Sequence, residues 1–191
     1  MASSSPAPDR TDQERWTLIW VRDLEAEQLQ TRDGERTACA RIEDQGSSLT
    51  LDGTVLPWLS DLRRDPLRGS RAFCAAVDDQ LQDWIDVRTE DPRSLLCVAG
   101  DFNQDLGASH YYGSRIGKQH LRASLQFAGL RCCTAGDLDP VHPSTGRQSI
   151  DHLMLDERIR MTGKAVAWPD YEGVGKRLSD HYGVWTEVSL L

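Results

Sequence analysis

An apolar run passes directly into a polar turn at Leu95–Asn103, which reads LLCVAGDFN. The apolar half is short and continuous, which is typical of a central strand that is buried on both faces. Gly100 allows another backbone or a ligand to come close. Asp101 and Asn103 are two positions apart, so both side chains point to one side if the strand continues, and Phe102 points into the core. The stretch predicts a buried strand that ends in a carboxylate and an amide.

Along the rest of the chain, stretches in which apolar residues recur at every second position alternate with stretches in which they recur every three to four positions. Strands are expected at 16–21, 37–42, 49–56, 150–155, 165–168 and 182–188. Helices are expected at 70–85 and at 118–128, the second ending at Gly129. The run at 16–21 is almost continuously apolar, so we expect it to be buried, and a turn signal joins 37–42 to 49–56 in an antiparallel hairpin. This order predicts an α/β protein in which two mixed or antiparallel sheets pack face to face with helices outside.

Length and composition are those of an ordinary globular protein. The 191 residues suffice for one domain with a sizeable core. No apolar run reaches the roughly 20 residues that a membrane-spanning helix needs, and Met1–Pro8 lacks the apolar centre of a secretory signal. We therefore expect a cytoplasmic protein with no membrane partner. Residues 1–14 are rich in Ser, Pro, Ala and charge, which predicts a disordered leader before one domain at 15–191.

Charge and cysteine content exclude some classes of protein. The net charge of −8 gives no support for a general nucleic-acid-binding surface, which is normally basic. A local basic strip or bound cations can offset the mean charge, so a nucleic-acid substrate stays open. The five cysteines are odd in number and show no Cys-x-x-Cys spacing, which argues against a disulfide framework or a zinc site.

Two further polar clusters lie at predicted strand ends and read SIDHL and LSDH. In the first, Asp151 lies within an otherwise apolar strand, where an unpaired charge is costly, so it needs a partner such as a protonated histidine or a metal ion. His152 faces the opposite side and is expected to be structural. In the second, Asp180 and His181 project to opposite sides, so that Asp180 can reach a metal ion while His181 reaches a substrate or Asp151.

Each cluster alone also fits an ordinary turn. Asp and Asn are common where a strand ends, so a turn explains GDFN equally well, and an isolated Asp-His pair is more often a surface turn. The combination is more informative. GDFN, IDH and SDH place three aspartates, an asparagine and His181 at strand ends, and chance alone rarely places all of these residues there together.

With these three motifs the chain resembles the endonuclease/exonuclease/phosphatase family, whose DNase I-like fold is shared by nucleases, abasic-site endonucleases, inositol polyphosphate phosphatases and sphingomyelinases. The resemblance runs from about Trp16 to the C-terminus. It is strong at Gly100–Asn103, Ile150–His152 and Ser179–His181. It implies a four-layer α/β sandwich of two packed mixed β-sheets with outer helices.

The resemblance also implies a role for each matched residue. Asp101 would orient or activate the attacking water, and Asn103 would bind a phosphoryl oxygen. His181 would contact the scissile phosphate or transfer a proton, while Asp151 orients it and stabilises its charge. Asp180 would contribute to a site for Mg²⁺ or Mn²⁺, which would neutralise charge on the phosphate and the leaving oxygen.

Parts of the family pattern are not matched. In the family, an early strand with an asparagine and a later strand with a metal-binding glutamate precede the matched region, so the resemblance implies a domain that lacks its first part. Glu25 and Glu27 are weak substitutes for that glutamate, and Val55 stands where many members have a histidine. A fragment, a truncated product and a degenerate member all fit this pattern.

Three functions follow as hypotheses. The first is a divalent-metal-dependent phosphoesterase that hydrolyses a phosphodiester or phosphomonoester by in-line attack of water. The second is an inactive remnant that acts as a binding module, which the missing glutamate favours. The third is an unrelated hydrolase with an Asp–His dyad, disfavoured because no serine or cysteine lies in a GxSxG motif.

The substrate stays open between nucleic acid, a sugar phosphate and a lipid headgroup, and no obligate protein partner is indicated. A set of five residues that follow the GDFN turn could contact a phosphodiester, although a solvated loop and helix face is the preferred interpretation. They are Tyr111, Tyr112, Arg115, Lys118 and His120.

Overall fold

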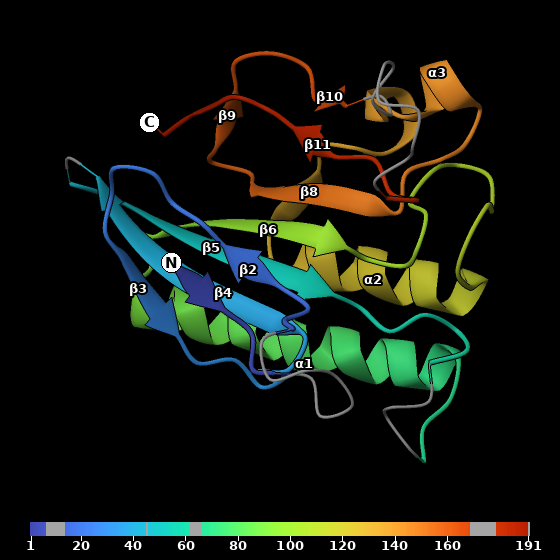
Figure 1. Ribbon diagram of the computed structural model, residues 1–191, viewed down its shortest axis with the longest axis horizontal. Coiled ribbons are helices and arrows are strands. Elements are labelled where there is room, and N and C mark those ends of the chain that lie inside the picture. Colours follow the sequence, from blue (N-terminus) through green and yellow to red (C-terminus); the bar gives the residue numbers. More distant parts are fainter. Residues whose placement is uncertain (7–13, 45, 62–65, 169–178, 191) are drawn as a thin grey trace.

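The centre of the computed structural model is a mixed sheet of six strands in the order β3-β4-β5-β6-β8-β7 (Figure 1). The model describes residues 1–6, 14–44, 46–61, 66–168 and 179–190. The strands are β3 (Ala26–Leu29), β4 (Thr37–Asp44), β5 (Ser47–Val55), β6 (Leu95–Asp101), β7 (Leu130–Cys132) and β8 (Asp151–Asp156). β5 and β6 run parallel, and the other neighbours run antiparallel. The predicted hairpin and central strand are confirmed.

Two long helices cover one face of this sheet. α1 (Ser70–Glu90) connects the parallel strands β5 and β6, as a crossover must, and α2 (Arg115–Phe127) lies beside it (Figure 1). The side chain of Ser114 caps α2 by accepting the N–H of Gly117 at 2.9 Å. Gly129 follows the helix with a φ of 62°, a conformation that favours glycine. The main core lies between the helices and the sheet and includes Phe73, Val77, Trp84, Leu96, Val98, Leu121, Leu125 and Met154.

The opposite face of the sheet carries short antiparallel strand pairs. β1 (Ala2–Ser3) pairs with β2 (Leu18–Ile19) and packs over β4 and β5. The other pairs are β9 (Arg160–Met161) with β12 (Val188–Ser189), and β10 (Val166–Ala167) with β11 (Val184–Trp185). The predicted layered α/β architecture is therefore confirmed. In the part of the chain that the structure describes, these pairs form the second layer of strands, and the long helices lie on the first face.

Two predictions for the N-terminal region were wrong in part. Ala2–Ser3 forms β1 and Ala2 is buried, so these residues belong to the folded part and not to a disordered leader; residues 7–13 lie outside the described residues. The run at 16–21 is not buried throughout, because Leu18 is 57% and Trp20 68% exposed. Ile19 between them faces the core, so this strand has one buried side.

Candidate active site

The end of β6 and the start of β8 bring two carboxylates together. The strands are antiparallel and pair Asp101 with Asp151 in register. Nδ1 of His181 lies 2.9 Å from Oδ2 of Asp151, and its Nε2 lies 3.9 Å from Oδ2 of Asp101. One ligand atom from each of the three residues lies within 4.8 Å of the others. Motifs far apart in the sequence thus form one cluster, as expected for Asp151 and His181.

Asn103 reaches Asp101 through a turn. β6 ends at Asp101, and Asn103 has a left-handed φ of 46°, so the continued strand assumed from the sequence is not formed. Asp101 accepts the backbone N–H of Asn103 at 2.8 Å and its Nδ2 at 2.9 Å. Nδ2 also donates to the backbone oxygen of Leu56 at 2.9 Å. Phe102 is fully buried in the core, as predicted. The turn therefore holds the amide and the carboxylate as one unit.

Gly100 sets the position of this unit. Its φ of 147° is one that side-chain-bearing residues rarely adopt, and a Cβ would overlap the backbone oxygen of Thr54 on β5. The predicted close approach of another backbone is therefore confirmed. The adjacent register pair joins Val55 to Asp101. The absence of a side chain at Gly100 lets β5 and β6 meet and places Asp101 at their shared edge.

The charges of the cluster perturb one another. Burial raises the pKa of Asp101 to about 6; the Asn103 N–H opposes this, and the charge of Asp151 adds to it. The hydrogen bond with Asp151 raises the pKa of His181 to about 9, against the opposing effect of burial. The charges of Asp151, Asp101 and Asp180 also raise it. At neutral pH the metal-free site thus holds a protonated imidazole among carboxylates.

His152 is structural, as predicted. It is 1% exposed, its Nδ1 lies 3.0 Å from Oγ1 of Thr134, and its Nε2 lies 3.0 Å from the backbone oxygen of Gln104. Burial lowers its pKa, so the ring is neutral at physiological pH. His152 therefore fixes the segment after the GDFN turn, while its neighbour Asp151 faces the site.

The carboxylates proposed for the metal lie in different places. Asp180 lines the hollow beside His181 but is not part of the three-residue group, and its role as a metal ligand stays a prediction. Glu25 and Glu27 are exposed and lie outside the group. The sequence also contains a Gln-Glu pair at 13–14, which three residues separate from β2; Glu14 is exposed and is not in the group either. Within the described residues, the cluster consists of Asp101, Asp151 and His181.

Sequence reasoning missed a buried ion pair behind the site. Lys118 was interpreted as part of a solvated face, but it is 7% exposed and forms an ion pair with the fully buried Asp105. Lys118 lies three positions before Leu121 on the buried side of α2, and that spacing was the available signal.

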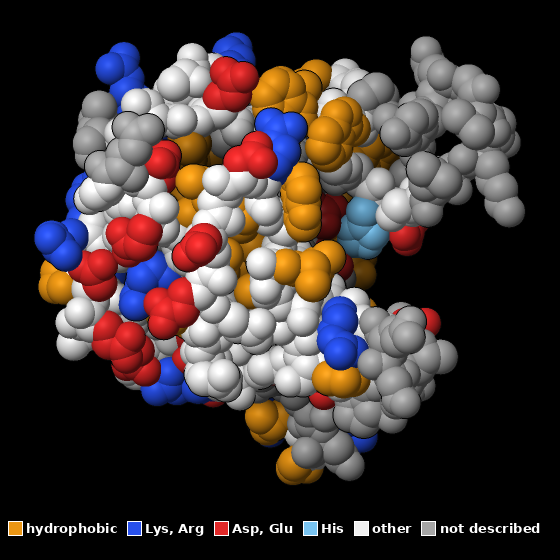
Figure 2. All heavy atoms as spheres, turned by 60° about the vertical axis from the view of Figure 1, so that its left-hand side comes forward, with side chains coloured by type: hydrophobic (Ala, Val, Ile, Leu, Met, Phe, Trp, Pro, Cys, Tyr) orange, Lys and Arg blue, Asp and Glu red, His pale blue; other side chains and the backbone are white. Residues whose placement is uncertain are grey.

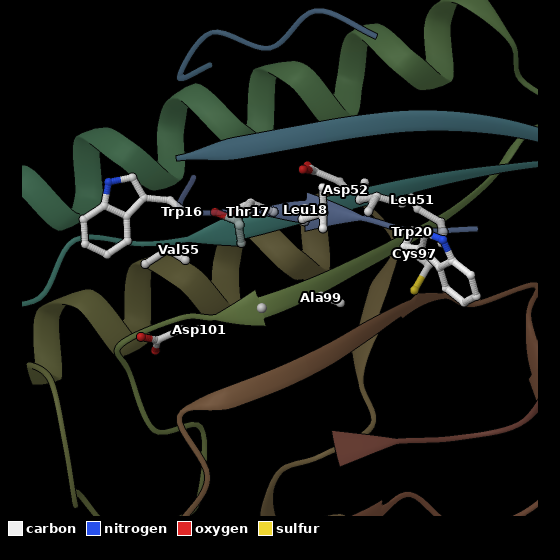
Figure 3. Close-up of a pocket in the computed structure, with 14 residues that line it drawn as sticks. Trp16, Thr17, Leu18, Trp20, Leu51, Asp52, Val55, Cys97, Ala99 and Asp101 are labelled. Carbon is white, nitrogen blue, oxygen red and sulfur yellow. The ribbon is translucent and has the colours of Figure 1, made fainter. Parts of the chain in front are cut away.

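Two hollows border the cluster. A pocket of about 210 Å³ is lined by residues that include Asn103, Asp151 and His181. On the other side, a groove of about 480 Å³ runs between β2 and the strands β5 and β6. Figure 3 shows Asp101 and Trp16 at one end of this groove and Trp20 at the other. In the space-filling view, hydrophobic side chains gather in a patch on the displayed face, apart from most of the acidic ones (Figure 2).

Comparisons identify the fold. No protein-family model and no curated protein sequence matches the chain. Among solved structures, the endonuclease domain of TRAS1, a telomere-specific non-LTR retrotransposon, superimposes with a TM-score of 0.59 and 18% identity over 98% of this chain and 77% of that one. The human Nocturnin catalytic domain superimposes with a TM-score of 0.54 and 16% identity, over 94% of this chain and 62% of that one. An endonuclease/exonuclease/phosphatase from Beutenbergia cavernae superimposes with a TM-score of 0.52 and 17% identity, over 82% of this chain and 40% of that one.

The chain has the endonuclease/exonuclease/phosphatase fold. These similarities confirm the predicted fold. The chain spans less than two thirds of the Nocturnin and Beutenbergia structures. Because all three identities are below 20%, activity and substrate have to be argued from the site itself.

Proposed function

We propose that the chain is a divalent-metal-dependent phosphoesterase that hydrolyses a phosphoester by in-line attack of water. The observation that carries this proposal is the convergence of Asp101, Asp151 and His181 within 4.8 Å, with Asp101 lining one hollow and Asp151 and His181 lining another. The TRAS1 domain, which has the same fold, is an endonuclease. Two carboxylates and an imidazole are suited to binding a cation and to moving a proton.

The cluster is suited to Mg²⁺ or Mn²⁺. Oxygen-rich sites prefer these ions, and burial raises the pKa of Asp101, which means that its charge lacks full compensation in the metal-free protein. We propose that Asp101 holds the ion and that Asp180 contributes from the adjoining motif. A bound divalent cation would stabilise the charge that develops on the phosphoryl group.

The protein residues then have distinct roles. The carboxylate of Asp101 orients the attacking water. His181, protonated and held by Asp151, donates a proton or a hydrogen bond to the phosphate. Asn103 binds a phosphoryl oxygen through Nδ2, whose two hydrogens are donated to Leu56 and Asp101 in the free site. A phosphoryl oxygen would replace Asp101 as acceptor once that carboxylate binds a cation.

Hydrolysis of bis(p-nitrophenyl) phosphate and of plasmid DNA tests the proposal, with Mn²⁺ or Mg²⁺ and with EDTA. We expect metal-dependent hydrolysis that falls at least about 100-fold in His181→Ala, as for loss of a general acid–base group. His142→Ala is the matched control, because His142 is exposed on α3 (His142–Thr145) and does not line the pocket.

A folded wild-type chain that neither hydrolyses these substrates nor binds Mn²⁺ in calorimetry would contradict the proposal. That outcome would favour the binding module, because in the described residues no glutamate joins the cluster.

A further inference from the structure

The pocket on the Asn103 side of the site carries features that hydrolysis alone does not require. Besides the cluster residues, its lining includes Tyr111, Tyr112 and Arg147. Pockets that enclose a whole small molecule typically measure about 300–1,000 Å³, whereas this one measures about 210 Å³. It is therefore sized for one part of a substrate whose remainder stays outside.

The two tyrosines are exposed on a fixed backbone. Tyr111 and Tyr112 are 47% and 40% exposed, although tyrosine rings gain by burial. Oδ2 of Asp105 accepts both of their backbone N–H groups, at 3.0 and 2.9 Å. Nε2 of Gln104 donates to the backbone oxygen of Tyr112 at 2.8 Å. The aromatic pair is thus presented beside the cluster by a preorganised loop.

The ion pair that anchors this loop is buried. Lys118 neutralises Asp105 and also donates to the backbone oxygen of Ser109 at 2.7 Å. Gln148, from the segment before β8, donates to Oγ of Ser109 at 2.5 Å. A buried ion pair has a large desolvation cost, and a freely solvated loop would not require such a pair to hold it in place. The loop is therefore better interpreted as a wall of the pocket.

Arg147 supplies a cation on the rim. It is exposed, and in the described part of the chain its guanidinium forms no ion pair. A guanidinium binds phosphate oxygens in a bidentate manner. The chain has a net charge of −8, so the positively charged side chain of Arg147 beside acidic site residues favours an anionic ligand.

Resting on the function proposed above, we propose that this pocket is a nucleotide subsite. Tyr111 and Tyr112 stack on a nucleobase beside the scissile phosphate, and Arg147 binds a neighbouring phosphate. The substrate class is then a single-stranded nucleic acid. A sugar phosphate or a lipid headgroup has no π face for the tyrosines, whereas every nucleobase has one.

The test compares two tetranucleotides with the same phosphates, one of single-stranded DNA and one fully abasic. Binding is measured by fluorescence anisotropy in EDTA, so that turnover does not interfere. Stacking on one base predicts that the base-containing probe binds at least about fivefold more tightly. The preference should disappear in the double variant Tyr111→Leu/Tyr112→Leu and persist in the corresponding Phe variant. Arg147→Gln should weaken both probes equally.

Phe127→Leu is the matched control, because Phe127 is a 74% exposed ring at the end of α2, outside the pocket. Equal affinity of the wild type for both probes, or a preference that survives in the double Leu variant, overturns the subsite. Hydrolysis is measured in parallel with Mn²⁺. Base-dependent binding without hydrolysis supports the subsite and contradicts the proposed function. Equal binding of both probes, with both hydrolysed, contradicts the subsite and supports the proposed function.

Discussion

His181 is bound to both carboxylate oxygens of Asp151, with Nδ1 3.0 Å from Oδ1 and 2.9 Å from Oδ2. Its other nitrogen faces Asp101 at 3.9 Å. The imidazole therefore links the two carboxylates that β6 and β8 place in register. Because the pKa of His181 is raised to about 9 and that of Asp101 to about 6, the charge of the site changes across the range in which enzymes work.

The His181–Asp151 pair should make stability depend on pH. A histidine whose folded-state pKa is raised stabilises the fold fully below its ordinary value of about 6.5. This contribution is lost as the pH rises through about 9. Asp151→Asn should therefore lower the melting temperature in EDTA at pH 6.5 and have a much smaller effect above pH 9. Thermal unfolding between pH 6.5 and 10 measures this, and a difference that stays constant over the range would contradict it.

Asp101→Asn should separate stability from metal binding. A carboxyl with a raised folded-state pKa stabilises the fold most at low pH, and this contribution is lost as the pH rises through about 6. At pH 8 in EDTA the variant should unfold at the wild-type temperature or above it, while the Mn²⁺-induced rise of the wild type disappears. Asp137→Asn, an exposed carboxyl outside the cluster, should keep that rise. A metal-free Asp101→Asn variant that is clearly destabilised would count against the argument.

Lys118→Met should destabilise the protein strongly. It leaves the fully buried Asp105 without its counter-charge, and breaking one side of a buried pair costs about 3–5 kcal/mol. Adding Asp105→Asn should restore part of the loss, because the remaining amide oxygen can still accept from Tyr111 and Tyr112. Urea unfolding measures both variants. Arg115→Met, at an exposed position on the same helix, should change the free energy of unfolding by no more than about 0.5 kcal/mol.

Gly100→Ala should lower the free energy of unfolding by about 2 kcal/mol or more, through backbone strain and overlap with Thr54. Gly163→Ala is the control, because a Cβ there meets nothing within 4 Å. Chemical denaturation of both variants measures the difference. Similar values for the two would show that β5 and β6 can separate at low cost.

The central strand, the hairpin and the need of Asp151 for a charged partner could be predicted from local signals. A short apolar run predicts a buried strand, a turn signal predicts a hairpin, and a charge inside an apolar strand predicts a partner nearby. The catalytic roles of Asp101, Asn103, Asp151 and His181, and the metal role of Asp180, stay predictions.

Other features depend on partners far away in the sequence. Lys118 is buried because Asp105 lies beneath it, and Ala2–Ser3 becomes a strand because β2 lies alongside. Composition gives no information on either contact. Trp20 stays exposed because only one side of β2 packs on the sheet, and an apolar run does not reveal how many layers will cover it.

Gly100 also bears on how relatives of this chain should be compared. A side chain there would overlap the backbone of Thr54 and strain the junction of β5 and β6 beside Asp101. In a lineage that lost the proposed reaction, selection for the reaction would no longer act on His181 or Asp180, yet the sheet would still require the glycine. Conservation of Gly100 among such relatives would indicate an intact scaffold, whereas divergence at His181 would indicate the loss of selection for the proposed reaction.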